Sequence, residues 1–102
     1  MSAKITNAPA LMNVMARVAK ERIRQQELFR AGKFTFTCAS HTADDNRKLR
    51  ILVEEVGEVA EAIDRVENSK INHLPAKEHL RDELVQVAAV ACAWLESMEG
   101  KP

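Results

Sequence analysis

The segment "LVQVAAVACAWL", residues 84–95, decides the fold of this chain. Eleven of its twelve residues are apolar, and the exception is an amide, Gln86. It continues an amphipathic segment, so we expect a helix, and a helix without a polar face must be enclosed on every side. The run is too short to span a bilayer, which takes about 20 apolar residues. We therefore expect an all-α bundle of three long helices per chain, completed by oligomerisation because one short chain cannot enclose this helix alone.

The rest of the sequence is periodic, with few interruptions: three glycines and three prolines in 102 residues. Start and stop signals predict three helices. The first runs from the N-cap Asn7 to Gly32, and the second runs from about 46 to 67 after a cap at Asp44 or Asp45. The third runs from Pro75 to near Gly100. The segment "KFTFTCASHTA", 33–43, has β-favouring residues but no partner strand, which indicates an ordered loop. We expect residues 1–7 to be a flexible leader and 8–100 to form a single domain.

Composition limits the class of protein. Lysine plus arginine and aspartate plus glutamate balance at 15 each, which argues against a protein that coats nucleic acid or a membrane surface. The two cysteines, Cys38 and Cys92, have no disulfide or metal-site spacing, and free thiols are typical of a reducing cytosol. The N-terminus carries no signal-peptide pattern. We therefore expect a cytoplasmic protein without nucleic-acid or membrane partners.

The second predicted helix has two distinct rows of side chains. Its apolar residues recur at steps of three and four, which predicts one stripe facing the core: Leu49, Leu52, Val56, Val59, Ile63 and Val66. The neighbouring row contains Ile51, Glu55, Glu58 and Ala62. Glu54 and Glu61 lie on the opposite side, where we expect them to face water. Gly57 is expected to allow close approach of another helix.

Two helices offer oxygen ligands at the same spacing. Glu55 and Glu58 lie one turn apart on one helix, and Glu83 and Gln86 repeat this spacing on the other. Carboxylates at the edge of a core repel one another unless a cation neutralises them. Oxygen ligands favour Mg²⁺, Mn²⁺ or Ca²⁺ over zinc or copper. The alternative interpretation is a solvated glutamate face without any ion.

The same residues resemble a known signature. "LVEEVGEVAEAI", 52–63, followed by "ELVQV", 83–87, resembles the motif of the MazG-like all-α nucleoside triphosphate pyrophosphohydrolases, Glu-Glu-x-x-Glu and then Glu-x-x-Asp. The segment "ERIRQQELF", 21–29, is similar to the N-terminal helix of phage and bacterial members. The resemblance covers most of residues 17–98. The departure is Gln86, which stands where the family pattern has aspartate.

This resemblance implies both an assembly and an activity. Members are dimers or tetramers of helical protomers that bind Mg²⁺ at the carboxylate cluster, so the expected state is a homodimer or homotetramer, with Mn²⁺ as an alternative ion. They cleave the α–β phosphoanhydride of nucleotides and release a monophosphate and pyrophosphate. Carried over by position, Glu55, Glu58 and Glu83 are the expected catalytic metal ligands. Gln86 is a neutral fourth ligand, and Glu54 matches a motif position although it points outward.

A nucleotide also needs residues that bind its phosphates and its base. Basic residues group before the glutamates at Arg47, Lys48 and Arg50, and along the first helix at Arg17, Lys20 and Arg24. Lys48 is the first candidate because it lies two turns before Glu55 on the same helix. For the base we expect Gln25 and an aromatic ring of the loop, Phe34 or Phe36. For each of these residues, a solvated face or a structural role is the alternative.

Three functions are consistent with these patterns. The first is a Mg²⁺-dependent nucleotide pyrophosphohydrolase. The second is a catalytically silent relative that binds a nucleotide or metal as a regulatory module, which Gln86 favours. The third is a structural oligomerisation module without a ligand. His41, His73 and His79 show no ligand spacing, so we assign them no role.

Overall fold

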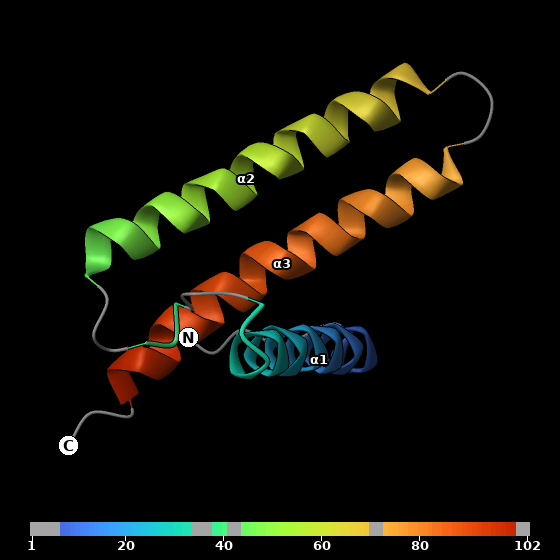
Figure 1. The fold of residues 1–102 in the computed structure, drawn as a ribbon. Coiled ribbons are helices and arrows are strands. Elements are labelled where there is room, and N and C mark those ends of the chain that lie inside the picture. Colours follow the sequence, from blue (N-terminus) through green and yellow to red (C-terminus); the bar gives the residue numbers. More distant parts are fainter. Residues whose placement is uncertain (1–6, 34–37, 41–43, 70–72, 100–102) are drawn as a thin grey trace, which may run out of the picture.

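A computed structural model describes residues 7–33, 38–40, 44–69 and 73–99 of the chain. These residues form three α-helices, α1 (Ala8–Arg30), α2 (Asp45–Asn68) and α3 (Leu74–Glu99), shown in Figure 1. The expected all-α class is confirmed, and each helix ends within two residues of its predicted boundary. Within the described ranges, no helix is long and apolar enough to cross a membrane.

Both ends of α1 and the start of α2 carry the capping residues that the sequence indicated. The Asn7 side chain accepts a hydrogen bond from the Ala10 backbone N–H (3.1 Å), and Asp44 accepts one from Arg47 (2.8 Å). Gly32 follows α1 with φ +76°, a left-handed conformation that favours glycine. Its N–H bonds to the Phe29 carbonyl, and the next N–H bonds to the Leu28 carbonyl, the two hydrogen bonds of a Schellman motif.

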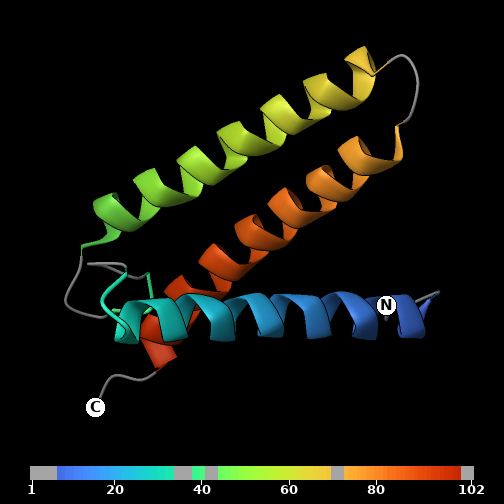
Figure 2. The same ribbon diagram turned by 45° about the vertical axis from the view of Figure 1, so that its right-hand side comes forward.

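Helix α3 is the centre of the fold. It packs against both α1 and α2. Figure 1 shows α2 and α3 as a long antiparallel pair, and Figure 2 shows α1 lying across the C-terminal half of α3. The N-terminal half of α1 diverges from the α2–α3 pair, which leaves a groove of about 420 Å³ lined by Val14, Val18, Leu84, Val85 and neighbouring residues.

The core of the chain is small and built from small side chains. Ala89, Val90 and Ala93 of α3, Ala62 of α2 and Cys38 are its buried apolar residues within the described ranges. No large side chain is fully buried there, so the packing of a single chain removes little apolar surface from water. A core this small gives the folded single chain only modest stability, so we expect association with another chain to add to it.

The predicted core stripe of α2 is only partly correct. Leu52, Val59 and Val66 are half-buried, but Leu49, Val56 and Ile63 are exposed. Helix α3 instead packs on the neighbouring row, where Lys48 and Ala62 are buried and Ile51 and Glu55 are half-buried. The two rows are offset by roughly 60–100° around the helix, so contact with α3 leaves the far edge of the stripe uncovered.

Two further expectations concern how closely α2 and α3 are packed. A Cβ built on Gly57 would meet nothing within 4 Å, so this glycine does not allow a close helix approach here. Leu84 and Leu95 at the two ends of the apolar run of α3 are exposed, so the single chain does not enclose this helix on every side, as expected for one short chain. Among the described helices, α2 packs on α3 alone and α3 packs on α1 and α2, so one side of each of these two helices stays uncovered.

Candidate metal centre

Three carboxylates converge between α2 and α3. Glu55 and Glu58 lie on one face of α2, and Glu83 approaches them from the antiparallel α3. Each offers a carboxylate oxygen, and these oxygens all lie within 4.8 Å of one another. The structure thus brings together the three glutamates that the sequence pattern grouped. Glu54 and Glu61 are exposed, in agreement with their expected outward direction.

Without a cation, the negative charges of these three carboxylates are partly buried and repel one another. Glu83 is buried and Glu55 is half-buried, and one oxygen of each, Oε2, is buried without a hydrogen-bond partner. Burial, followed by the charges of Glu58 and Glu83, raises the pKa of Glu55 from 4.5 to about 7. Burial and then the hydrogen bond and charge of Glu58 also raise the pKa of Glu83.

This donor set fits a hard divalent cation. The two buried carboxylate oxygens without partners, one of Glu55 and one of Glu83, are acceptors that a cation can satisfy. Together with the nearby carboxylate of Glu58, they match the oxygen ligands of Mg²⁺ or Mn²⁺. Glu58 is exposed, so the cluster is open to solvent at the position of Glu58. Gln86 is half-buried one turn after Glu83, which places its Cα on the same side of α3. A role for the Gln86 amide as a ligand stays a prediction.

His79 belongs to this neighbourhood, although the sequence patterns gave it no role. Its Nε2 lies 3.6 Å from Glu83 Oε1 and 3.0 Å from the Arg65 NH1. The charge of His79 opposes the rise in the pKa of Glu83. The signal in the sequence was the i,i+4 spacing of His79 and Glu83, which places them on one helix face. His79 belongs to no His–His or Glu-x-x-His ligand pair in the sequence.

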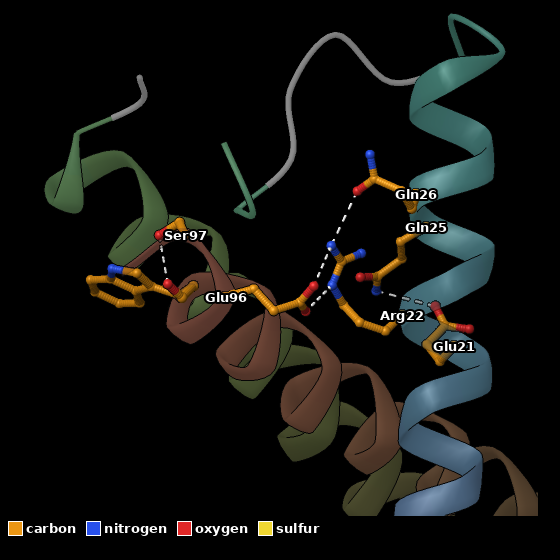
Figure 3. Close-up of polar contacts among 7 residues, drawn as sticks. Glu21, Arg22, Gln25, Gln26, Glu96 and Ser97 are labelled. Atoms are coloured by element: carbon orange, nitrogen blue, oxygen red, sulfur yellow. Dashed lines mark hydrogen bonds and ion pairs between the residues drawn. The ribbon is translucent and has the colours of Figure 1, made fainter. Parts of the chain in front are cut away.

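Helix α1 also contributes an acid near the cluster, Glu21. Its charge adds to the rise in the pKa of Glu55. The Glu21 carboxylate accepts hydrogen bonds from Arg24 (2.8 and 2.7 Å) and from Gln25 (3.2 Å), the latter drawn in Figure 3. Its own pKa is lowered, first by the Arg24 hydrogen bond. The approach of Glu21 depends on how α1 crosses the bundle, which local sequence patterns do not reveal.

The expected substrate-binding residues have different surroundings. Arg24 and Gln25 are engaged with Glu21. Lys48 is buried, and its Nζ donates to Ser97 Oγ (2.8 Å), so it does not lie on an open surface. Phe34, Phe36 and His41 lie outside the described residues. The row formed by Arg17, Lys20 and Arg24 lines an open groove of about 570 Å³ together with Glu21, Ile23, Glu27, Asp82 and Val85.

Comparison with known proteins gives no identification. No protein-family model, no curated protein and no solved structure matches the chain. The function is therefore argued from the carboxylate cluster and its surroundings.

Proposed function

We propose that the chain is a Mg²⁺-dependent, MazG-like nucleotide pyrophosphohydrolase that cleaves the α–β phosphoanhydride of a nucleoside triphosphate. The observation that carries this proposal is the convergence of Glu55, Glu58 and Glu83 within 4.8 Å, with two buried oxygens unpartnered. The resemblance of the two glutamate segments to the family motif supports it. Other metal sites with oxygen ligands are common, so it is the motif that directs the proposal to nucleotides.

The proposed roles follow from the positions of the side chains. Glu55, Glu58 and Glu83 would hold the divalent cation, and Mn²⁺ could replace Mg²⁺. The bound ion would neutralise phosphate charge and polarise the phosphorus that is attacked. The open groove beside Arg17, Lys20 and Arg24 lies next to Glu21, and its cations would attract the phosphates from solvent. Gln25 and Phe36 stay proposed contacts for the base.

We further propose that the chain acts as a homodimer or homotetramer. Large apolar side chains on all three helices are exposed in the single chain: Leu11, Met12, Val14, Met15, Ile23, Leu49, Val53, Val56, Ile63, Leu74, Leu84, Leu95 and Met98. An exposed apolar surface of this extent is typical of a protein–protein interface. A second copy would also cover the ends of the apolar run on α3.

The direct test is a panel of canonical and modified nucleoside triphosphates, assayed for pyrophosphate release with Mg²⁺ and with Mn²⁺. We expect turnover of some member of the panel, loss of turnover in Glu58→Gln, and little change in Glu61→Gln. The latter removes the same charge from an exposed position of the same helix. Absence of pyrophosphate release across the whole panel would refute the proposed activity.

Gln86 supports one alternative, a catalytically silent module that binds a nucleotide or a metal. With glutamine at this position the cluster has three carboxylates instead of the four of the family pattern, and therefore less charge to hold metal. Ligand-induced thermal stabilisation without turnover would select this alternative over the enzyme.

A further inference from the structure

Arg65 of α2 is a cation beside the carboxylate cluster. It follows Glu58 by seven residues, which is close to two turns, so both lie on the same side of α2. The Cα–Cβ bond of a helical residue tilts toward the N-terminus of its helix, and the Arg65 side chain therefore starts in the direction of Glu58. Arg65 and Glu58 are both exposed, so this end of the cluster is open to solvent and accessible to a ligand.

His79 of α3 links the Arg65 guanidinium to the third carboxylate. Arg65 NH1 lies 3.0 Å from His79 Nε2, and the same Nε2 lies 3.6 Å from Glu83 Oε1. His79 precedes Glu83 by about one turn on a helix antiparallel to α2. The contact therefore lies at one end of the cluster, toward the C-terminus of α2 and the N-terminus of α3.

The contact between Arg65 and His79 determines which atom donates. A guanidinium carries N–H donors and no acceptor, so Arg65 donates and His79 Nε2 accepts. This hydrogen bond requires the neutral imidazole, with its proton on Nδ1. Nε2 then has no hydrogen to give to Glu83. Whenever His79 is neutral in this way, the positive charge at this end of the cluster is that of Arg65.

The other donors of Arg65 are unused. Among the described residues, its Nε and NH2 have no hydrogen-bond partner, and no carboxylate lies within ion-pair distance of its guanidinium. An arginine that served to neutralise the glutamates would pair with one of them directly, whereas Arg65 donates to an imidazole. Its charge and two edges of its planar fork are therefore available to an anion.

We propose that Arg65 binds the phosphate chain of a nucleotide held at the carboxylate cluster, and that His79 positions Arg65 for this contact. The inference rests on the proposed function. The fork of a guanidinium matches two oxygens of a phosphate, and its charge stabilises the pyrophosphate that leaves. Arg65 thus takes the role expected for Lys48, which is buried against Ser97.

The test measures binding of pyrophosphate, the proposed product, by calorimetry at saturating Mg²⁺, so that no turnover is needed. The wild type should bind magnesium pyrophosphate. Arg65→Gln should bind it about tenfold more weakly, because hydrogen bonds to a charged group are lost. Its affinity for Mg²⁺ alone should not fall, because Arg65 is not a metal ligand. The matched control is Arg81→Gln, which removes an exposed arginine of α3 that pairs with Glu78 and should bind pyrophosphate as the wild type does.

Two variants of His79 test the positioning role. His79→Leu removes the acceptor for Arg65 and should weaken pyrophosphate binding. His79→Gln offers a side-chain oxygen in its place and should restore most of the affinity. The double variant Arg65→Gln/His79→Leu should bind no more weakly than Arg65→Gln alone, because both changes remove the same interaction. Circular dichroism checks that all variants are folded.

The inference is overturned if the wild type does not bind magnesium pyrophosphate, or if Arg65→Gln binds it as the wild type does. It is also overturned if Arg65→Gln weakens Mg²⁺ binding to the same extent. His79→Gln that binds as weakly as His79→Leu would refute the positioning role. Failure of the proposed function has a different signature, which is absence of turnover whatever the affinity for pyrophosphate. If Arg65→Gln turns over a nucleotide with the kcat and KM of the wild type, the function stands and this inference fails.

Discussion

Arg22 and Glu96 lie 74 positions apart in the sequence and form an ion pair of 2.6 Å that joins α1 to the C-terminal part of α3. The Arg22 side chain is buried, and Gln26 on the next turn of α1 holds a second edge of its guanidinium. The core residues within the described ranges are few and small. We therefore infer that this polar contact, rather than extensive apolar packing, fixes how α1 crosses α3.

Removal of the Glu96 carboxylate should destabilise the chain measurably. Glu96→Gln leaves a buried guanidinium without its counter-charge, and we expect the free energy of unfolding to fall by about 1–3 kcal/mol. The control is Glu78→Gln, which breaks the exposed ion pair with Arg81 and should cost about 0.5 kcal/mol or less. Urea denaturation followed by circular dichroism measures both. Equal losses in the two variants would show that the Arg22–Glu96 contact contributes no more to the free energy of unfolding than an exposed ion pair does.

The metal-free protein should lose stability as the pH rises. The pKa of Glu55 in the folded chain is about 7, above its ordinary 4.5, so the folded state binds more protons than the unfolded state between these values. Its stabilising contribution is complete below pH 4.5 and is lost as the pH passes 7. Glu83, whose pKa is also raised, acts in the same direction. Melting temperatures in EDTA from pH 5 to 8 should fall, and Glu55→Gln should flatten the profile.

A divalent cation should reverse this loss. Protons and Mg²⁺ compete for the same carboxylates, so Mg²⁺ should raise the melting temperature more at pH 8 than at pH 5.5. At about 100 times its dissociation constant, a ligand adds about 2.7 kcal/mol to the free energy of unfolding. Glu58→Gln should abolish most of this gain, and Glu61→Gln should retain it. A melting temperature that does not respond to Mg²⁺ would favour the structural oligomerisation module.

Gln86→Asp separates the enzyme from the silent module. A fourth carboxylate should tighten Mg²⁺ binding and lower the stability of the metal-free protein, because one more negative charge joins the cluster. The two effects can be measured by calorimetry and by melting in EDTA. If the wild type binds nucleotide without turnover and the variant releases pyrophosphate, Gln86 is the cause of the silence. If neither effect appears, the residue 86 side chain does not face the metal site.

Local signals in the sequence were sufficient for the helices and for the grouping of the acids. Caps and a left-handed glycine act within a few residues, so Asn7, Asp44 and Gly32 could be recognised without knowledge of the fold. The Glu-x-x-Glu spacing likewise fixes two carboxylates on one face of a helix. The antiparallel pairing of two long helices then brings Glu83 to them.

What the sequence did not reveal depends on which helix faces meet. Lys48 was expected to bind phosphate because it is a cation two turns before Glu55 on the same helix, yet α3 packs on its row and buries it. The approach of Glu21 to Glu55 depends on the crossing of α1, and the uncovered part of the α2 stripe depends on where α3 lies. Hydrophobic periodicity identifies an apolar face but not the partner that covers it.

That uncovered face provides the test of assembly. Val53 and Val56 of α2 are 59% and 51% exposed in the single chain, so a charged side chain at either position can point into solvent without entering the core. If a second copy covers this face, Val56→Glu must bury an unpaired charge at the interface, which costs several kcal/mol and should dissociate the oligomer. Sedimentation velocity should show a dimer or tetramer for the wild type and a monomer for the variant. Glu61→Arg, on the water-facing side of the same helix, should assemble normally. A wild type that stays monomeric at every concentration would contradict the proposed assembly, and an unchanged oligomer in Val56→Glu would place the interface on another face.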